Sequence, residues 1–474
     1  MFKIIFISIL FLIIFSTSTA FSYQENPEIV VDSYKIEKLV TGLNVPIALD
    51  FIGNDILVLQ KNDGIIRLIE NDVLHEQPVL DLEVSNYGEQ GLLGITIVEN
   101  KIYLFFTESF HDGGVSIGNR VYEYTWNDGI LSEPKLIKSL PGWVQAYNAG
   151  VMTHDLENNV LVVSGSQYKF GASQNTSFEE SVNCKTDKIT CNNENKVTFS
   201  DSIQQTLSCM NVSFYHYTTN PFGHQTTQPD LSQNPLELNP YNIITNLSSC
   251  INAFFYNNFS NGDWKETSVV LQVEPESEFY RAIGIRNSFG LSVDPITGNL
   301  WMTENGPDKF DEINLVENKF NSGWAKIIGP INDQNLEKIS PYEDYSYSDP
   351  EFSWELPIGI TAIDFPNNSF SSYKNSLFVA DTNHGNIYAL KLNQERTGFE
   401  LKSPHLKDLI VNIDPENTFG NFHESMDEIL FGKNFGVITD MKFGPDGKLY
   451  LVSIMDGTIS VSYTHLTLPT IYSV

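Results

Sequence analysis

The chain has 474 residues, of which 41% are hydrophobic and 12% are aromatic, so general disorder is excluded and a substantial core is expected. Its 28 basic and 59 acidic residues give a formal net charge of −31. Such a negative surface repels phosphate backbones and anionic lipid, which argues against nucleic-acid binding.

The N-terminus has the features of a secretory signal peptide over residues 1–20. Lys3 is the basic flank, an apolar stretch runs from Ile4 to Phe15, and Ser18-Thr-Ala20 is a small-residue cleavage site. The apolar stretch is too short for a comfortable bilayer span, and no later stretch reaches that length. We therefore expect a secreted or extracytoplasmic protein, with a retained N-terminal membrane anchor as the alternative.

A strand-rich unit recurs six times between residues 34 and 460. Each unit begins with an apolar strand that contains small residues, and a turn leads to a second strand of alternating hydrophobic residues. The six units begin near Val45, Gly91, Asn148, Asn287, Gly359 and Gly436. This repeat predicts an all-β fold, a six-bladed β-propeller, in preference to a sandwich. Tyr34 to Leu39 is expected to close the ring by pairing with the last blade.

Residues 169–265 interrupt this repeat between the third and fourth blades. The segment is too long for a plain loop, so we expect an inserted subdomain or lid. It contains all four cysteines of the chain, Cys184, Cys191, Cys209 and Cys250. They predict two disulfides within the insertion, in any of three pairings. A zinc site is the competing interpretation, and the lack of a Cys-x-x-Cys spacing argues against it.

The stretch 284–315 carries the densest set of candidate binding residues. Arg286, at the start of a predicted strand, offers a permanently charged guanidinium that suits a carboxylate. Four candidate oxygen ligands follow the next hairpin: the main-chain carbonyls of Gly306 and Pro307 and the carboxylates of Asp311 and Glu312. Hard oxygen ligands of this kind suit Ca²⁺. On pattern alone, such a cluster after a strand is more often an ordinary turn.

The same stretch resembles the glucose/sorbosone dehydrogenase family. The matching residues are Gly284-Ile-Arg-Asn-Ser-Phe-Gly-Leu291, Trp301-Met-Thr-Glu-Asn-Gly-Pro307, Asp311-Glu-Ile-Asn-Leu-Val316 and Asn321-Ser-Gly-Trp324. Members of that family are soluble quinoprotein sugar dehydrogenases on a six-bladed β-propeller. The resemblance implies that pyrroloquinoline quinone lies over the central channel and that Ca²⁺ polarises its reactive carbonyl. It also implies a histidine that accepts the sugar hydroxyl proton as hydride moves to the quinone.

The resemblance further implies roles for single residues. Gln90, within Glu89-Gln-Gly-Leu-Leu93, matches a glutamine that contacts quinone and substrate. Arg286 and Asn287 match a quinone-contacting pair. The carbonyls of Gly306 and Pro307 match ligands of the active-site Ca²⁺, and the two carboxylates that follow match an acidic run of the same loop.

Three positions depart from the family pattern. Tyr147-Asn-Ala-Gly150 stands where the family usually has His-x-Gly-Gly, so the catalytic base position holds tyrosine, a residue type with an ordinary pKa of about 10. Val437-Ile-Thr-Asp440 stands where quinone-binding members have Arg-x-Arg-Asp, and Asp381-Thr-Asn-His-Gly385 stands where they have a lysine. One matched cation would then remain for a cofactor with three carboxylates. His154 and His384 lie near these positions and are more simply a strand and a turn residue.

Residues 461–474 show no turn or blade pattern. The segment Val461-Ser-Tyr-Thr-His-Leu-Thr-Leu-Pro-Thr470 resembles a translated sequencing adapter. We therefore expect an artefactual tail, a native sequence interrupted near Ser460, and a truncated last blade. Sequencing the locus past codon 460 tests this expectation.

The sequence as a whole favours an exported sugar dehydrogenase-like protein that oxidises an aldose or polyol with pyrroloquinoline quinone and Ca²⁺. The alternative is a non-catalytic Ca²⁺-binding propeller that binds glycan or protein, since a fold does not fix a function. No phosphate-binding glycine loop, Gly-x-Ser-x-Gly element or His-Glu-x-x-His element occurs in the sequence. Nicotinamide chemistry, serine hydrolysis of the common type and zinc proteolysis are therefore unsupported.

Overall fold

The structure is a computed structural model that describes residues 26–127, 129–142, 144–167, 266–273, 280–331, 339, 344–367, 370–413 and 423–464. In this part of the chain the secondary structure is almost entirely β-strand, with two short 3₁₀ helices at Ser371–Tyr373 (η4) and Pro404–Leu406 (η5). The predicted signal peptide, the insertion at 169–265 and all four cysteines lie outside the described residues. None of the helices that are described could cross a membrane.

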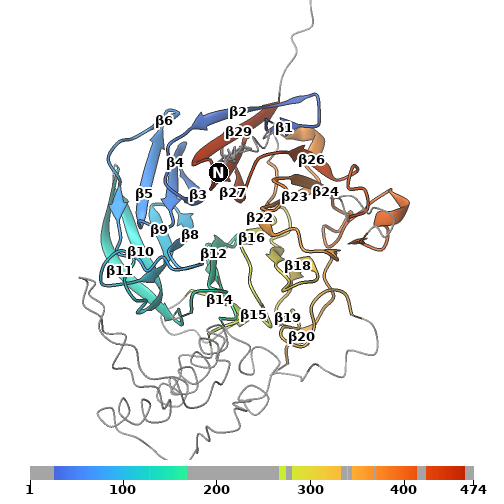
Figure 1. Ribbon diagram of the computed structural model, residues 1–474, viewed down its shortest axis with the longest axis horizontal. Coiled ribbons are helices and arrows are strands. Elements are labelled where there is room, and N and C mark those ends of the chain that lie inside the picture. Colours follow the sequence, from blue (N-terminus) through green and yellow to red (C-terminus); the bar gives the residue numbers. More distant parts are fainter. Residues whose placement is uncertain are drawn as a thin grey trace, which may run out of the picture.

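Six sheets surround a central axis (Figure 1). The first contains β3 (Pro46–Ile52), β4 (Asp55–Gln60), β5 (Ile65–Glu70), β6 (Val73–Leu74) and β7 (Leu80–Asp81). The second contains β8 (Leu92–Val98), β9 (Lys101–Glu108), β10 (Gly118–Asn127) and β11 (Ile130–Leu140). The third contains β12 (Ala149–His154), β13 (Val160–Ser164), β14 (Val269–Gln272), β15 (Tyr280–Ile283), β19 (Phe320–Asn321) and β20 (Ser346–Tyr347).

The other three sheets complete the ring. The fourth contains β16 (Gly290–Val293), β17 (Leu300–Glu304), β18 (Asp311–Val316), β21 (Phe352–Trp354) and β25 (Ile410–Val411). The fifth contains β22 (Ile360–Asp364), β23 (Ser376–Asp381), β24 (Ile387–Lys391), β26 (Leu430–Lys433) and β1 (Glu28–Ile29). The sixth contains β27 (Ile438–Phe443), β28 (Leu449–Ser453), β29 (Thr458–Thr464) and β2 (Tyr34–Val40).

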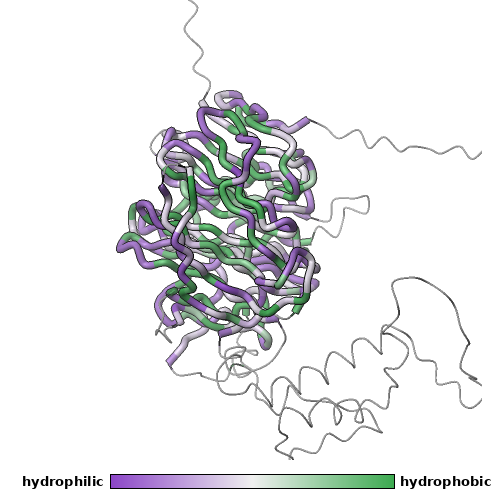
Figure 2. Tube along the Cα trace, turned by 90° about the vertical axis from the view of Figure 1, so that its left-hand side faces the viewer, coloured by the Kyte–Doolittle hydropathy of each residue, from purple (hydrophilic) through white to green (hydrophobic). Residues whose placement is uncertain are grey.

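The hydrophobic core is divided among the spaces between neighbouring sheets. One large cluster, between the fourth and fifth sheets, contains the fully buried rings of Trp301, Trp354 and Tyr388. In the side view of Figure 2, hydrophobic segments run through the body and hydrophilic segments predominate at its rim. A single sheet has no partner for its two apolar faces, so each sheet depends on its neighbours for burial.

One strand of each sheet lies nearest the axis, and these six, called the first strands, are β3, β8, β12, β16, β22 and β27. Adjacent first strands contact one another all the way round the ring. Small residues allow this close approach. Gly290 on β16 is an example, because a Cβ there would lie 2.2 Å from the carbonyl oxygen of Thr361 and 2.7 Å from the Thr303 hydroxyl oxygen. Backbone of the fourth and fifth sheets therefore approaches more closely at Gly290 than any other residue type permits.

Replacing Gly290 with alanine is expected to lower the free energy of unfolding by about 1–3 kcal/mol, because the added methyl forces two sheets apart. Urea denaturation of wild type and variant measures this difference. Gly398→Ala is the matched control, since the nearest atom to its added Cβ is 3.4 Å away and lies on the Asn393 side chain. Equal losses in both variants would refute the crowding argument.

Strand β2 closes the ring by pairing antiparallel with β29, from Tyr34 opposite Thr464 to Val40 opposite Ile459. The expected closure by the N-terminal strand is thus confirmed. The sixth sheet has four strands, so the predicted truncated last blade is wrong. Residues 461–464 of the predicted tail belong to β29, and Val461 is buried. The artefactual origin of residues 461–474 stays a prediction.

The predicted all-β propeller is confirmed, whereas the prediction of a six-bladed propeller built from one repeated unit and ending in a truncated blade is wrong. The sheets contain four, five or six strands, and they interleave along the chain. Strands β19 and β20 follow the fourth sheet's β18 but extend the third sheet by parallel pairing, and β25 extends the fourth sheet in the same way. The physical reason is that the outer edge of a sheet presents unpaired N–H and C=O groups, which short returning segments of the chain satisfy.

Candidate functional site

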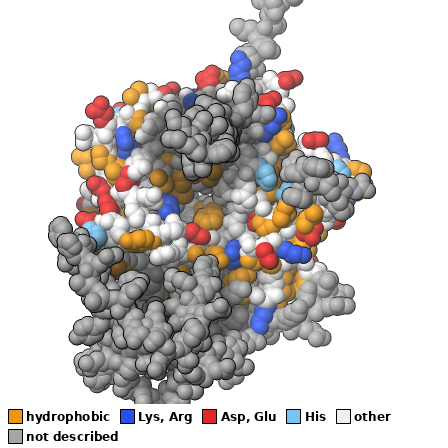
Figure 3. All heavy atoms as spheres, viewed as in Figure 1, with side chains coloured by type: hydrophobic (Ala, Val, Ile, Leu, Met, Phe, Trp, Pro, Cys, Tyr) orange, Lys and Arg blue, Asp and Glu red, His pale blue; other side chains and the backbone are white. Residues whose placement is uncertain are grey.

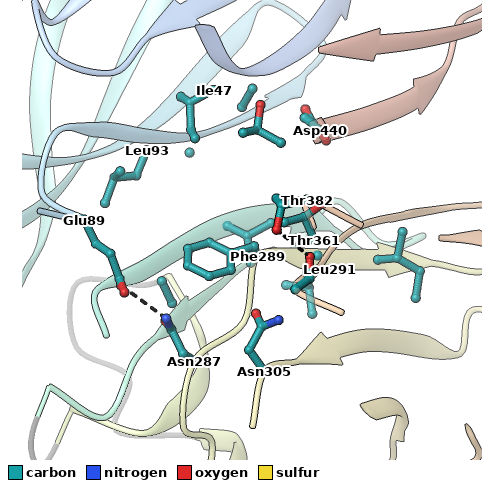
Figure 4. Close-up of a pocket in the computed structure, with 18 of the residues that line it drawn as sticks. Ile47, Glu89, Leu93, Asn287, Phe289, Leu291, Asn305, Thr361, Thr382 and Asp440 are labelled. Atoms are coloured by element: carbon teal, nitrogen blue, oxygen red, sulfur yellow. Dashed lines mark hydrogen bonds between the residues drawn. The ribbon is translucent and has the colours of Figure 1, made fainter. Parts of the chain in front are cut away.

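A cavity of about 480 Å³ lies on the axis of the ring. Residues from all six first strands line it: Ala48, Gly94, Val151, Gly290, Thr361 and Thr439. The face seen in Figure 3 is hollowed near its centre. Ile47, Leu93, Phe289 and Leu291 contribute apolar walls, and Glu89, Asn287 and Asn305 lie together on one side, which we call the polar end (Figure 4).

Arg286 lies at the polar end of the cavity and is 7% exposed. Its Nη1 donates to the carbonyl oxygens of Asn305 at 2.7 Å and Gly306 at 3.2 Å. The guanidinium carbon lies 4.5 Å from the centre of the Tyr147 ring and 5.5 Å from that of Trp324. Aromatic faces favour a cation held in this way. Arg286 thus lines the cavity and holds the loop at 305–306 through two hydrogen bonds, and its predicted contact with a quinone stays a prediction.

Lys61 is a second cation in the cavity wall, and sequence reasoning missed it. It follows β4 in the first sheet, and its Nζ donates to the Gly88 carbonyl oxygen at 2.8 Å and to Asn62 Oδ1 at 3.1 Å. Burial lowers the pKa of the ammonium, and the nearby Glu89 opposes that shift. In the sequence Lys61 is a basic residue in an ordinary turn, Gln60-Lys-Asn-Asp-Gly64, after a strand of the first sheet. Nothing in this turn indicates a functional residue.

Glu89 lines the cavity, whereas the neighbouring Gln90 is not among the lining residues. The side chain of Gln90 is buried, and its Nε2 donates to the carbonyl oxygens of Gly142 at 2.8 Å and Val144 at 3.2 Å. Its Oε1 accepts from the Ser85 hydroxyl at 2.8 Å. The side chain that lines the cavity is Glu89 (Figure 4). Gln90 thus fastens a loop, and its predicted catalytic and cofactor-binding roles stay predictions.

The Glu89 carboxylate faces Asn287 and Asn148. Its Oε2 accepts from Asn287 Nδ2 at 3.2 Å and from the Asn148 backbone N–H at 3.2 Å (Figure 4). Burial raises the pKa of Glu89, while these hydrogen bonds and the charge of Arg286 act in the opposite direction. Asn287 therefore lines the cavity and donates to a carboxylate there, and its predicted contact with a quinone stays a prediction.

The four predicted Ca²⁺ ligands have different surroundings. Gly306 and Asp311 line the cavity, whereas Pro307 is exposed and Glu312 is buried. The Asp311 carboxylate accepts backbone N–H groups of Gly306, Ile358, Gly359 and Ile360 at 2.7–3.2 Å. Glu312 accepts from Asn314 Nδ2 at 3.1 Å and from the Gly329 N–H. Both carboxylates thus hold loops, and within the described residues no group of three or more His, Cys, Asp or Glu side chains is placed to hold a metal.

Glu312 forms a buried acidic pair with Glu304, its partner across β17 and β18. Glu304 accepts from the Arg286 backbone N–H at 2.6 Å and from the Ser322 hydroxyl at 2.6 Å. Burial raises the pKa of both carboxyl groups, and the charge of Glu304 raises that of Glu312 further. The folded protein therefore retains protons on this pair that the unfolded chain releases.

This acidic pair predicts that stability falls as the pH rises. The folded pKa of Glu304 lies above the ordinary glutamate value, so its contribution is complete below that value and is lost as pH rises toward the folded pKa. Each proton retained contributes a slope of about 1.4 kcal/mol per pH unit. Glu304→Gln can still accept from the Arg286 N–H and can donate to the Ser322 hydroxyl oxygen, so it should show a shallower decline between pH 5 and 7 in urea denaturation. The exposed Glu395→Gln should keep the wild-type slope, and an unchanged slope in Glu304→Gln would contradict the prediction.

Of the tyrosine and the two histidines singled out in the sequence, Tyr147 lines the cavity and the histidines lie outside its wall. Tyr147 lines the polar end, and the Arg286 guanidinium lies over its ring. His154 contacts Thr96, and burial lowers its pKa. His384 lies beside the loop at 382–383, and its interaction with buried Asp381 raises its pKa. Tyr147 thus reaches the site, whereas the two histidines do not line it.

A third lining cation, Lys442, lies near the far end of the cavity. Its Nζ is 3.4 Å from Asp50 Oδ2, and the carboxylates of Asp50, Asp440 and Asp364 raise its pKa against the effect of burial. Thr439 stands in the wall where the family pattern has an arginine, and Asn383 stands where the pattern has a lysine. The cations of the described lining residues are thus Lys61, Arg286 and Lys442.

Several buried polar atoms at the polar end have no hydrogen-bond partner within the described part of the chain. They are Arg286 Nε, Asn287 Oδ1 and Asn305 Oδ1, and all three residues line the cavity. A buried polar atom without a partner costs about 1–3 kcal/mol. Such atoms therefore mark a place where a bound polar group would be stabilising.

Residues 265–461 match the model of the family described as Glucose / Sorbosone dehydrogenase, which confirms the resemblance over this part of the chain. The aldose sugar dehydrogenase YliI of Escherichia coli (strain K12) is 25% identical over 116 residues, which are 24% of this chain and 31% of that relative. The chain thus spans about a third of the length of the curated relative that it matches.

Solved structures share the fold over nearly the whole chain. The PQQ-bound form of an aldose sugar dehydrogenase from Streptomyces coelicolor is 16% identical with a TM-score of 0.55, and the match covers 93% of this chain and 100% of that one. A calcium structure of a carbohydrate-active enzyme of family AA12 from Trichoderma reesei is 12% identical with a TM-score of 0.51, covering 93% of this chain and 97% of that one. At these identities the likeness shows the fold.

Proposed function

We propose that this chain is an exported quinoprotein that oxidises an aldose or another polyol with pyrroloquinoline quinone bound in the axial cavity. One observation carries the proposal. Arg286 and Asn287, from the family-matched stretch, meet Lys61 and Glu89 from two other sheets in the wall of one cavity. The relatives named above supply the cofactor and the substrate class, because one solved neighbour is described as PQQ-bound and the curated relative as an aldose sugar dehydrogenase.

The residues present fit a planar, carboxylate-bearing quinone. Such a cofactor supplies a two-electron acceptor for hydride. Arg286 would hold one carboxylate, since its Nε lacks a partner among the described residues, and Lys61 would attract another. Leu93, Phe289 and Leu291 would cover the flat faces and exclude water. Lys61 and Lys442 lie outside the positions that match the family pattern. The cavity wall therefore has more positive charge than the matched positions alone indicate.

Ca²⁺ fits this site less completely. Gly306 lines the cavity, but its carbonyl oxygen accepts from Arg286, and the carboxylates of Asp311 and Glu312 are engaged in other hydrogen bonds. A Ca²⁺ ion would therefore depend on the main-chain carbonyls of Gly306 and Pro307 together with oxygen atoms from outside the described residues. We propose Ca²⁺ as a cofactor on this reduced ligand set.

Titration of the full-length protein with pyrroloquinoline quinone, with and without Ca²⁺, tests the proposal through the quinone absorbance. A dye-linked assay with aldoses and polyols then measures turnover. Saturable quinone binding together with sugar-dependent dye reduction would support the proposal. Binding of neither quinone nor Ca²⁺, with no turnover at high quinone concentration, would leave a non-catalytic propeller that binds glycan or protein.

A further inference from the structure

We propose that Glu89 accepts the hydroxyl proton of the substrate, in place of the histidine that the family pattern has at the Tyr147 position. This inference rests on the proposed dehydrogenase function and names the residue of the same site that carries out the proton transfer. It concerns a side chain one position before the glutamine singled out in the sequence.

The loop that carries Glu89 is held tightly in place. The Glu89 backbone N–H donates to the Gln145 carbonyl oxygen at 2.7 Å, and Gly88 has a φ of +59° with no room for a Cβ, which would lie 2.4 Å from the same oxygen. The carboxylate in turn accepts from Asn287 Nδ2 and from the Asn148 N–H. Backbone and side chain are thus fixed from the loops that precede β12 and β16, as a proton acceptor requires.

The other acidic groups of the described cavity wall are engaged in structural bonds. Asp311 accepts four backbone N–H groups, and Asp440 accepts the N–H groups of Leu49 and Met441 while it lies near Lys442. The Tyr147 ring is held against Arg286. Glu89 is therefore the lining carboxylate whose surroundings leave it best able to take up a proton.

The electrostatic surroundings of Glu89 suit a base at moderate pH. Lys61 faces it from the first sheet, Arg286 from the loop before β16, and Tyr147 from the loop before β12. Burial raises the pKa of the carboxyl above its ordinary value, and the hydrogen bonds and Arg286 limit that rise. A base is most effective when its pKa lies near the working pH, so a raised carboxyl can serve where an ordinary one is too weak.

The chemical step balances with a quinone as the oxidant. The O–H bond of the substrate hydroxyl breaks, and its proton goes to the Glu89 carboxylate. The C–H bond on the same carbon breaks, and hydride with its electron pair goes to the quinone, which is reduced. The substrate carbon is oxidised to a carbonyl, and Glu89 returns its proton to solvent.

The test compares Glu89→Gln, Glu89→Asp and the control Glu83→Gln, an exposed glutamate of the same loop. Quinone affinity is measured from absorbance, and kcat and kcat/KM are measured across pH. We expect Glu89→Gln to bind quinone within about 3-fold of wild type and to lose about 10²–10⁴-fold in kcat. Wild-type kcat/KM should rise with pH as Glu89 loses its proton. The pH profile of Glu89→Gln should lack this rise. Glu89→Asp should recover part of the activity, and Glu83→Gln should match wild type.

Two results would overturn the assignment of Glu89 alone: a kcat in Glu89→Gln within about 3-fold of wild type, or a loss of quinone affinity that accounts for the whole loss of activity. A wild-type protein that neither binds quinone nor turns over sugar would instead overturn the proposed function, and this inference with it. Melting temperatures of the variants show whether a loss arises from unfolding.

Discussion

Replacing Arg286 with alanine is expected to weaken quinone binding by at least about 100-fold, or about 2.7 kcal/mol. The guanidinium is buried at the polar end of the cavity, and its Nε lacks a partner among the described residues. A charge-assisted hydrogen bond to a carboxylate contributes about 1.5–3 kcal/mol at such a place. The substitution also releases the carbonyls of Asn305 and Gly306, so the loop that shapes the cavity loses its anchor.

Titration of apoprotein with pyrroloquinoline quinone, followed by absorbance, measures the loss. Lys309→Ala is the matched control, because it removes an exposed cation from the loop that contains Gly306. It should bind quinone as wild type does. Arg286→Lys separates charge from geometry: a lysine keeps the charge but cannot reproduce the planar fork, so partial recovery is expected. Unchanged affinity in Arg286→Ala would refute its role as the cofactor's carboxylate partner.

The first strands of the sheets were predictable because their signal is local. The apolar unit from Gly359 to Phe365, for example, contains β22, and the unit from Val45 to Phe51 overlaps β3. Small residues and a following turn suffice to recognise such strands. The short parallel strands β19, β20 and β25 have no such signal. They are two residues long, and their pairing depends on where a distant edge lies.

The site was predictable only where one stretch of chain supplies it. Arg286, Asn287 and Gly306 come from a single motif and do line the cavity. Gln90 comes from another motif and is not among the lining residues, because the carbonyls that bind its amide belong to Gly142 and Val144, far along the chain. Lys61 was missed for a related reason. Lys61 and Glu89 come near each other only because two sheets meet there, and the residues beside Lys61 in the sequence do not indicate that proximity.

The Asp294–Arg396 ion pair also could not be predicted from the sequence, because its two residues are 102 positions apart. Breaking this pair should have the largest effect on the free energy of unfolding. Arg396 Nε donates to Asp294 Oδ2 at 2.6 Å, and Nη2 donates to Oδ1 at 2.9 Å. The pair joins the β16–β17 hairpin of the fourth sheet to the loop after β24 of the fifth, and both side chains are buried. Asp294 also accepts from the Ile296 N–H and the Thr297 hydroxyl, so it fixes the hairpin turn.

Arg396→Met is expected to lower the free energy of unfolding by about 3–5 kcal/mol, because it leaves the Asp294 charge buried without its partner. Methionine keeps the apolar stem and, like arginine, carries a side chain at the positive φ of +56° found there, so backbone strain does not change. The double variant Asp294→Asn/Arg396→Met should recover part of the loss, since asparagine removes the charge, its Oδ1 can still accept from the Ile296 N–H, and its Nδ2 can donate to the Thr297 hydroxyl oxygen. Urea denaturation of the two single variants and the double variant gives the coupling energy.

Lys391→Ala is the control. It breaks the exposed pair with Glu400 in the same region and should lower the free energy of unfolding by no more than about 1 kcal/mol. A loss in Arg396→Met as small as that control would show that the buried pair does not hold the fourth and fifth sheets together.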